Sequence, residues 1–437
     1  MKALLSVIIF VLFYGFILSE KINKTIVAIM GASCVIFLGL VTFEEAVAAI
    51  DFNVIFLLVG MMTSVYILSK TGFFEWIAIN VAKRAQGDPW VIMVLLLTVT
   101  AVLSAFLDNV TTIIMLVPVT ILITQLLEIS PVPFVIMEAL VSNIGGTATL
   151  IGDPPNIIIG SQAGLSFNSF LWNLAPVVFI VFVVFLITAF FMFRKKFHVP
   201  EKIRKRVKEA IPRLAIVDKK NMIRSLIIFA FIFLGFLVHD MIDVKPGIIA
   251  LCGSMVMLLV CKSDSEDTLM KVEWGVIFFF IGIFMIISAL EVNGVMAWMG
   301  EYIISLAGNN LFYVCIVVLW GSALISAVMD NIPFVITMIP LVKHFIVFFS
   351  KNAGISDPVL INLHIAQPLW WALALGACLG GNGTLIGASA NIVMARISEK
   401  NNYPISFGKF FKYGFGFMAQ AMIICAVYIW LRYFWRA

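Results

Sequence analysis

Charged residues are scarce in this chain. Only 12% of its 437 residues are Asp, Glu, Lys or Arg, roughly half the share found in an ordinary soluble domain. Hydrophobic residues make up 62% of the chain and include 39 Phe, and the mean hydropathy is +1.10. A soluble core could not enclose so much apolar surface, so a water-soluble globular fold is excluded.

The sequence signs of enzymes and metal proteins are missing as well. The chain has only four His, and neither an HExxH nor a GxSxG motif occurs. Its six cysteines stand singly, without a CxxC pair, and we interpret them as buried small hydrophobic residues. We therefore expect no intramembrane enzyme, no resident metal and no cofactor beyond the coupling ion of a carrier.

What the chain has instead is long, continuous apolar runs, such as 91–106 and 177–193. Strands of a membrane barrel would alternate apolar and polar residues, so these runs predict transmembrane helices. The first run, 3–18, lacks a cleavage site of the A-x-A kind and has a counterpart 222 residues later. We interpret it as a retained span and expect an all-α polytopic membrane protein.

Two motifs occur twice. The segment Ser104–Asn109, SAFLDN, returns as Ser326–Asn331, SAVMDN. The 13 residues that begin at Gly145 match those that begin at Gly380 at eight positions. Duplicated polar and glycine-rich breaks inside apolar sequence point to the binding site of a secondary transporter.

The duplication divides the chain into three parts. Residues 1–193 form a first repeat, 194–221 a basic linker and 222–437 a second repeat. We expect five spans in each repeat, an odd number that would give the copies opposite orientations in the membrane. Each repeat should contain a re-entrant hairpin and a discontinuous helix, with the hairpins at 90–127 and 311–349 and the broken helices at 133–159 and 365–394.

The segment 194–224 gathers positive charge. It holds 12 of the 29 Lys and Arg residues against three acidic residues. Because basic loops stay in the cytoplasm, we expect an integral protein of a prokaryotic inner membrane with this segment inside and both termini outside. Nucleic-acid binding, the other interpretation of a basic stretch, is not expected.

Asp108 and Asp330 lie inside apolar sequence at the centres of the hairpins. A carboxylate at that depth costs about 2.5 kcal/mol or more, so each should face protein or water and take a proton or a cation. Either aspartate could also cap the helix that follows it, and the two roles are compatible. We expect both to couple transport to protons, with Asn109, Thr111 and Thr112 as additional oxygen ligands beside Asp108.

The glycine pairs that begin at Gly145 and Gly380 should permit positive φ and close backbone approach, which would free backbone groups for a ligand. Close helix packing through small residues is the alternative. Pro154 and Pro155 suit the start of a half-helix, whose amino end attracts anions. Asp153 has no acidic counterpart in the second copy, and it either caps that half-helix or binds.

The predicted substrate- and ion-binding residues come from both repeats. They are Asp108, Asn109, Thr111, Thr112, Asn143, Gly145, Gly146, Thr147, Thr149, Asp153, Asn156, Asp330, Asn331, Gly380, Gly381, Asn382, Thr384 and Asn391. Sodium, if it is the coupling ion, would be held by Asp108, Asn109 and Gly146. We expect no Lys or Arg near these breaks, so a multivalent anion would have to rely on amides and helix ends.

The stretches SAFLDNVTTIIMLVPV (104–119) and SNIGGTATLIGDPPNIIIGS (142–161), with their second-half counterparts, resemble the ion-transporter superfamily. The likeness is to the branch that holds arsenite permeases (ArsB), sodium/proton antiporters (NhaD) and the melanosomal P-protein, with a citrate-transporter-like domain. It covers the whole chain through the repeat, and its motifs are much less specific for the substrate than for the superfamily.

The resemblance implies an elevator-type carrier, usually a homodimer, in which hairpins and broken helices move against a scaffold. Segments 73–84 and 295–307 would be the arms that link the two parts. Divalent-anion/sodium symporters look like distant relatives, but they carry Ser-Asn-Thr at the hairpin tips where this chain has Asp-Asn at 108 and 330. That departure favours proton coupling over sodium/dicarboxylate symport.

We therefore predict a secondary active transporter that moves a small ion or oxyanion, coupled to protons or sodium. Arsenite-permease-like efflux by proton antiport is the leading interpretation, because neutral arsenous acid or a cation suits two buried acids. Sodium/proton antiport and transport of a citrate-like carboxylate or another anion are the alternatives. A channel is a remote further alternative, and large unitary currents would identify it.

Overall fold

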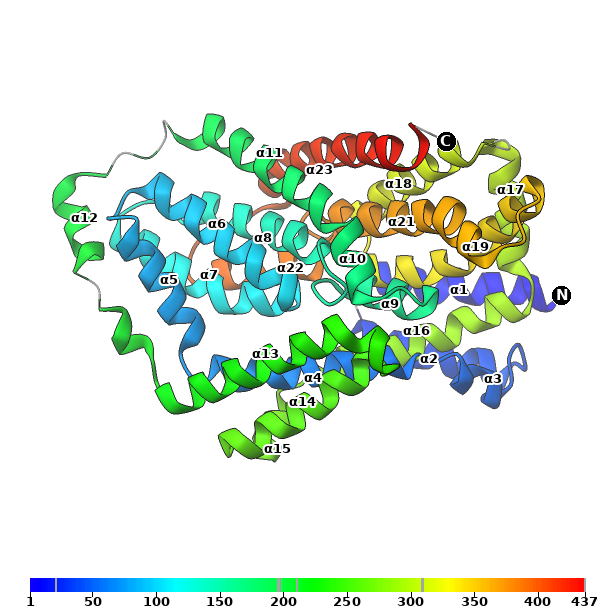
Figure 1. Ribbon diagram of the computed structural model, residues 1–437, viewed down its shortest axis with the longest axis horizontal. Helices are drawn as coiled ribbons and strands as arrows, with labels where there is room; N and C mark the ends of the chain where they lie inside the picture. Colours follow the sequence, from blue (N-terminus) through cyan, green and yellow to red (C-terminus); the bar gives the residue numbers. More distant parts are fainter. Residues whose placement is uncertain (20–21, 195–196, 198, 210, 308–309, 436–437) are drawn as a thin grey trace.

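The computed structural model of the chain describes residues 1–19, 22–194, 197, 199–209, 211–307 and 310–435. Over these residues the chain is built of helices and contains no strand (Figure 1). Ten helices of this described part are long and apolar enough to cross a membrane. The prediction of an all-α polytopic membrane protein is confirmed.

The described helices form two similar series joined by a linker. The first series is α1 (Lys2–Ser19), α2 (Lys24–Phe37), α3 (Phe43–Ala48), α4 (Phe52–Ser69), α5 (Phe73–Arg84), α6 (Pro89–Phe106), α7 (Asn109–Leu126), α8 (Val132–Thr147), α9 (Pro154–Ala163), α10 (Phe167–Asn173) and α11 (Ala175–Phe193). The linker contains α12 (Glu201–Lys208) and η2 (Pro212–Ala215). The second series is α13 (Lys219–Ile242), α14 (Pro246–Cys261), α15 (Ser265–Met270), α16 (Trp274–Val292), α17 (Val295–Ala307), α18 (Leu311–Val328), α19 (Asn331–Ala353), α20 (Pro358–Ile361), η3 (Asn362–Ala366), α21 (Gln367–Gly380), η4 (Gly381–Gly383), α22 (Ser389–Lys400), α23 (Phe407–Ile429) and η5 (Trp430–Phe434).

Two helical hairpins turn at an aspartate. Leu107 and Met329, which end the first arms α6 and α18, are extended with φ −120°, ψ 159° and φ −135°, ψ 157°. Asp108 and Asp330 then cap the second arms α7 and α19 by accepting from backbone N–H groups of the first turn. α6 packs against α7 and α18 against α19, so the chain reverses at each aspartate.

Several helix pairs, within the halves or between them, have an equivalent pair related by the repeat. α2 packs against α16 as α14 packs against α4, and α6 against α8 as α18 against α21. Across the centre, α7 packs against α22 as α19 packs against α9. The hairpins lie toward opposite ends of the molecule, α6 and α7 on the left and α18 and α19 on the right of Figure 1. The two halves thus interlock; their opposite orientation in a membrane stays a prediction.

The membrane-length helices coincide only in part with the expected division into spans and hairpins. Both arms of each hairpin qualify by length and hydropathy, whereas α2, α8 and α14 are apolar but shorter. An 18-residue arm is about 27 Å long, close to the hydrocarbon core of roughly 30 Å. Whether the hairpins re-enter the membrane therefore stays a prediction. α2 is short because it ends at Phe37, before the separate α3.

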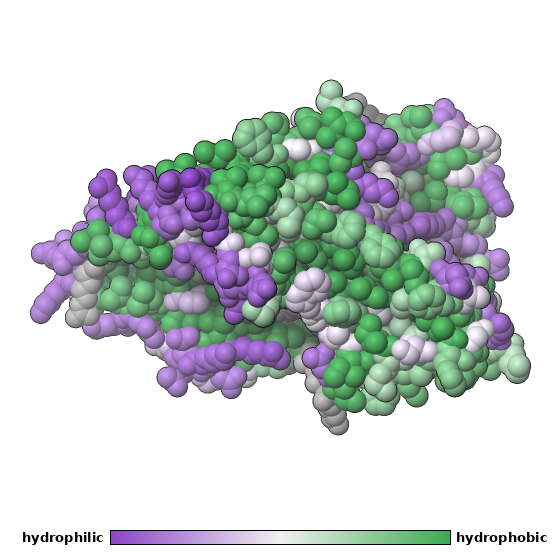
Figure 2. Space-filling view, turned by 90° about the horizontal axis from the view of Figure 1, so that it is seen from below, coloured by the Kyte–Doolittle hydropathy of each residue, from purple (hydrophilic) through white to green (hydrophobic). Residues whose placement is uncertain are grey.

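Large apolar side chains cover the outside of the molecule. Phe179 and Phe191 of α11, Phe231 of α13 and Leu259 of α14 each expose 67% or more of their surface. Figure 2 shows hydrophobic residues across much of one face, with hydrophilic residues gathered most densely at its left end, where Figure 1 places α12. Such a surface is stable only against lipid, in line with the composition.

Candidate functional site

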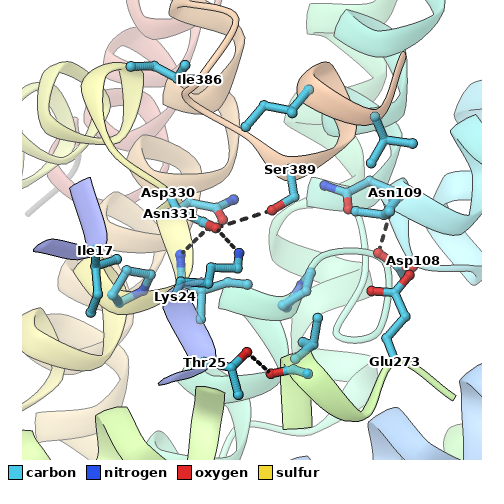
Figure 3. A pocket seen from close by; sticks show the side chains of 18 of the residues that line it. Ile17, Lys24, Thr25, Asp108, Asn109, Glu273, Asp330, Asn331, Ile386 and Ser389 are labelled. Carbon is cyan, nitrogen blue, oxygen red and sulfur yellow. Dashed lines mark hydrogen bonds and ion pairs between the residues drawn. The ribbon is translucent and has the colours of Figure 1, made fainter. Parts of the chain in front are cut away.

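A cavity of about 490 Å³ lies where the hairpin tips meet (Figure 3). Both predicted acids, Asp108 and Asp330, line it. Its other charged lining residues are Asp153, Glu273, Lys24 and Arg396. Lys24 and Asp330 lie on one side of the cavity in Figure 3, and Asp108 and Glu273 lie on the other.

Asp153 joins the two hairpins. It is fully buried, and the tip amides of both repeats, Asn109 Nδ2 and Asn331 Nδ2, donate to its Oδ1 at 3.4 Å. Its side chain forms no cap on α9, so the capping alternative does not apply. Oδ2 has no hydrogen-bond partner among the described residues. A buried carboxyl group left in this state is suited to hold a proton or a cation.

A chain of buried amides runs from Asp153 into the second half. Asn109 Nδ2 also donates to Asn143 Oδ1 at 3.0 Å. Asn143 Nδ2 in turn donates to Asn382 Oδ1 at 2.9 Å and to Asn391 Oδ1 at 3.2 Å. Because each of these side chains is at most 4% exposed, the network fixes the tip of the first hairpin relative to both breaks.

Asn156 and Asn391 hold the two breaks in shape. Asn156 Nδ2 donates to the carbonyl oxygens of Gly146, Thr147 and Thr149 at 3.4, 3.1 and 2.9 Å. Asn391 Nδ2 donates in the same way to the carbonyls of Gly381 and Thr384 at 2.9 and 3.0 Å. These five carbonyls at the breaks therefore already have a partner within the chain.

Two hydroxyl groups attach each hairpin to its broken helix. Ser104 Oγ donates to the Ser142 carbonyl at 2.6 Å, and Ser326 Oγ donates to the Ala377 carbonyl at 2.6 Å. Thr149 donates to the carbonyl of Ala105, and Thr384 to that of Ala327. The repeated serines and threonines of the motifs thus make equivalent bonds in both halves.

The two glycine pairs differ in their place, because the first lies inside α8 whereas the second lies at the break, with Gly380 ending α21 and Gly381 beginning η4. Gly145 and Gly146 belong to α8, and the chain leaves the helix only after Thr147. None of the four glycines has positive φ, so that expectation was wrong. A Cβ at Gly145 would come within 2.3 Å of the Ala101 carbonyl oxygen of α6, and one at Gly380 within 2.6 Å of the Ala323 Cα and carbonyl oxygen of α18. The glycines therefore let the broken helix pack tightly on the hairpin.

Asp108 is satisfied within its own helix. Its carboxylate accepts from the backbone N–H groups of Val110 and Thr111, both at 3.0 Å, and from the Thr111 hydroxyl at 2.5 Å. Thr112 Oγ1 donates to the Asp108 carbonyl at 3.0 Å. Both threonines therefore serve the tip itself in this conformation.

Asp330 has a basic partner. Lys24 Nζ lies 2.7 Å from its Oδ2, and Ser389 Oγ donates to the same oxygen at 3.2 Å. Arg396 also lines the cavity. The expectation that no basic residue lies near the breaks was therefore wrong. Lys24 reaches the second hairpin from 306 residues away, and Arg396 lies on α22, directly after the second break.

The predicted residues fall into two groups, those that line the cavity and those that do not. Five line it, namely Asp108, Asn109, Asp153, Asp330 and Asn331. The others lie outside the lining and largely fix the breaks and hairpins, namely Thr111, Thr112, Asn143, Gly145, Gly146, Thr147, Thr149, Asn156, Gly380, Gly381, Asn382, Thr384 and Asn391.

The lining residues that were not predicted include Lys24, Glu273, Ser389 and Arg396. Glu273 had a usable signal, because the repeat places Asp51 at its equivalent position. Ser389 also lies within the repeated motif, opposite Pro154. Lys24 and Arg396 carry no such signal, since their equivalents are Pro246 and Ser161.

Glu138 lies outside this cavity. It is 1% exposed on α8, and Thr120 Oγ1 of α7 donates to its Oε1 at 2.6 Å. Its Oε2 has no hydrogen-bond partner in the described part of the chain. It is therefore a second buried acid, which lies between α7 of the first hairpin and α8 of the broken helix.

The family model and two relatives that match this chain are described as transporters. The model of the CitMHS family, described as "Citrate transporter", matches residues 14–376. An uncharacterized transporter of Mycobacterium tuberculosis is 39% identical over 99% of both chains. An uncharacterized transporter of Synechocystis is 32% identical over 99% of this chain and 98% of its own.

More distant similarity is found in an animal protein and in a solved structure. The P protein of Sus scrofa is 32% identical over 95% of this chain and 58% of its own length. The crystal structure of the YdaH transporter of Alcanivorax borkumensis superposes with a TM-score of 0.58 at 12% identity, covering 89% of this chain and 88% of that one. At that identity the likeness concerns the fold alone.

Proposed function

Because this chain belongs to the CitMHS family and is a membrane transporter, we propose that it is a secondary active transporter in which proton binding at Asp153 drives the movement of a small solute. The observation that carries this proposal is the junction at Asp153. One fully buried carboxyl group accepts from the tip amides of both repeats and keeps an oxygen without a partner among the described residues. Any change in its charge would act on both hairpins at once.

The solute that best fits is a neutral hydroxylated species such as arsenous acid, exported in exchange for protons. Four carboxyl groups and two basic groups line the cavity, so the acids outnumber the bases. Such a lining disfavours a multivalent anion and suits a neutral donor of hydrogen bonds or a cation. Sodium/proton exchange follows from the same excess of acidic groups.

Transport of a carboxylate is the second candidate. Lys24 and Arg396 line the cavity, and an arginine guanidinium can bind a carboxylate through two parallel hydrogen bonds. The printed description of the matching family model, "Citrate transporter", supports the same candidate. Arg396→Gln would then weaken citrate uptake and leave arsenite transport near the wild-type level.

The experiment that separates these candidates is a proteoliposome screen. Arsenite, sodium, citrate and phosphate are offered in turn under an imposed pH gradient, and their accumulation is followed. We expect accumulation of arsenite against its gradient, driven by protons, in wild type and not in protein-free vesicles. Large single-channel currents without accumulation would contradict a carrier, and citrate accumulation alone would replace arsenite by the second candidate.

Three further features belong to this proposal: a homodimer, elevator-type movement of the hairpins and broken helices, and a cytoplasmic basic linker in a prokaryotic cell membrane. The equivalent packing of the two halves supports a moving unit built from both. The charge of residues 194–224 supports the cytoplasmic placement. Mass determination in detergent and protease access to the linker in right-side-out vesicles test the first and the last.

A further inference from the structure

The two hairpin tips satisfy their aspartates differently. Asp108 accepts two backbone N–H groups and the Thr111 hydroxyl from its own helix. Asp330 accepts only one N–H group from its own helix, that of Ile332 at 3.4 Å. Pro333 stands where Thr111 stands in the first copy, and proline has neither a hydroxyl nor an amide hydrogen. Oδ2 of Asp330 is consequently left to partners from other helices.

The partner that it finds is an ammonium group. Lys24 Nζ lies 2.7 Å from Oδ2, and the ammonium lies over the ring of Phe279 at 5.1 Å from its centroid. The two side chains are 34% and 18% exposed, so the pair lies at the edge of the cavity and can be reached by water and small ions (Figure 3). A lysine ammonium is a compact monovalent charge, which is the same charge that a proton or a sodium ion would bring.

This ion pair connects two helices whose main packing partners differ. Lys24 begins α2, which packs against α1, α3 and α16. Asp330 caps α19, which packs chiefly against α9, α17 and α21 and less extensively against α16. Any movement of the second hairpin relative to α2 would separate the pair. A bare carboxylate next to apolar helices is costly, so another cation would have to replace the ammonium group.

Resting on the proposed carrier function, we propose that Oδ2 of Asp330 is an exchangeable site for a monovalent cation, occupied by the Lys24 ammonium in this conformation and by a proton or Na⁺ once the tip has left α2. Lys24 then excludes the coupling ion from this site in one conformation only. The first tip has no equivalent device, since Asp108 is satisfied by Thr111 and Pro246 stands at the position of Lys24.

The test removes the lysine and measures cation binding through thermal stability. Purified Lys24→Met and wild-type protein are unfolded in detergent over a series of Na⁺ concentrations at neutral pH, and over a series of pH values without Na⁺. In the variant, a cation that fills Asp330 should raise the midpoint beyond any wild-type response, on the order of 1–3 °C for each tenfold increase above its dissociation constant. A response to Na⁺ identifies a sodium site, and a response to acid alone identifies a proton site.

Three controls make the result specific. Lys24→Arg keeps the positive charge and should behave as wild type. Adding Asp330→Asn to Lys24→Met should abolish the extra response. Lys70→Met breaks the pair of Lys70 with Asp267, whose side chains are 46% and 42% exposed, and should add no response because Asp267 stays hydrated.

The proposal is overturned if Lys24→Met responds to neither ion beyond wild type, or if its extra response survives Asp330→Asn. The measurement needs no transported solute. Failure here would therefore leave the transport screen unaffected, and a failed screen would leave this result standing.

Discussion

At the scale of single residues, the centre of the cavity is asymmetric. Asp153 accepts from the tip asparagines of both repeats, while the equivalent position in the second break is Ala388. Residues that the repeat duplicates, such as Ser104 and Ser326, make the same structural bond twice. The asymmetry therefore comes from positions where the repeat has diverged, such as Asp153, whereas duplicated residues such as the two serines keep the same structural role.

The side chain of Asp108 both caps α7 and carries a negative charge, and two substitutions separate these roles. Asn caps a helix about as well as Asp, whereas Ala lacks an acceptor and costs about 1 kcal/mol of stability. We expect Asp108→Ala to lower the midpoint of thermal unfolding and Asp108→Asn to leave it nearly unchanged. Equal losses in circular-dichroism melts of the two variants would contradict a capping role.

The sequence indicated Asp108, Asp330 and the asparagine that follows each of them as binding residues. Acids and amides inside apolar runs are costly in a membrane, so they are kept there mainly where they have a function. The role of Asp153 could be narrowed to two alternatives only. Which of them holds depends on the direction of its side chain, and that direction is set by the tips of both hairpins. Lys24 was beyond prediction, since 306 residues separate it from Asp330.

At the scale of elements, close packing of the broken helices on the hairpins positions the cavity. Gly145 meets the backbone of α6 at Ala101, and Gly380 meets that of α18 at Ala323. The sequence located both breaks to within a turn, since glycine, proline and asparagine interrupt apolar helices for general backbone reasons. It misassigned Gly145 and Gly146 to the first break itself, because close packing and helix interruption draw on the same residue type.

A matched pair of substitutions tests this packing. Gly145→Ala places a methyl group against the Ala101 carbonyl and should cost about 1–3 kcal/mol. Gly321→Ala, in α18, has no atom within 4 Å of the new methyl group and should stabilise by up to about 1 kcal/mol through helix propensity. Thermal midpoints in detergent check the pair. An equally stable Gly145→Ala protein would show that α8 does not need this close approach.

At the scale of the whole molecule, a second cavity is the repeat equivalent of the first. It measures about 240 Å³ and is lined by Asn53, Ser161, His239 and Lys245 among others. Asn53 corresponds to Gly275, and Ser161 to Arg396, both of which line the cavity at the tips. This second cavity does not reach the tips, because none of the four tip residues is in its lining.

An inverted repeat requires these cavities to open to opposite sides of the membrane. Ser161→Cys and Arg396→Cys are made in protein whose accessible Cys34 and Cys252 are replaced by Ala. A membrane-impermeant maleimide should label Ser161→Cys from outside and Arg396→Cys from the cytoplasmic side in oriented vesicles. Labelling of both from one side would refute the opposite orientation of the halves, which neither composition nor repeat spacing can establish alone.

The most direct test of the central claim uses Asp153→Asn, which keeps the shape of the side chain and removes its titratable group. For the solute found by the proteoliposome screen, both pH-driven accumulation and exchange across vesicles of equal pH are measured in wild type and variant. We predict that accumulation driven by the pH gradient falls about tenfold or more while exchange at equal pH persists. Wild-type accumulation by Asp153→Asn would contradict the assignment of this carboxyl group as the proton carrier.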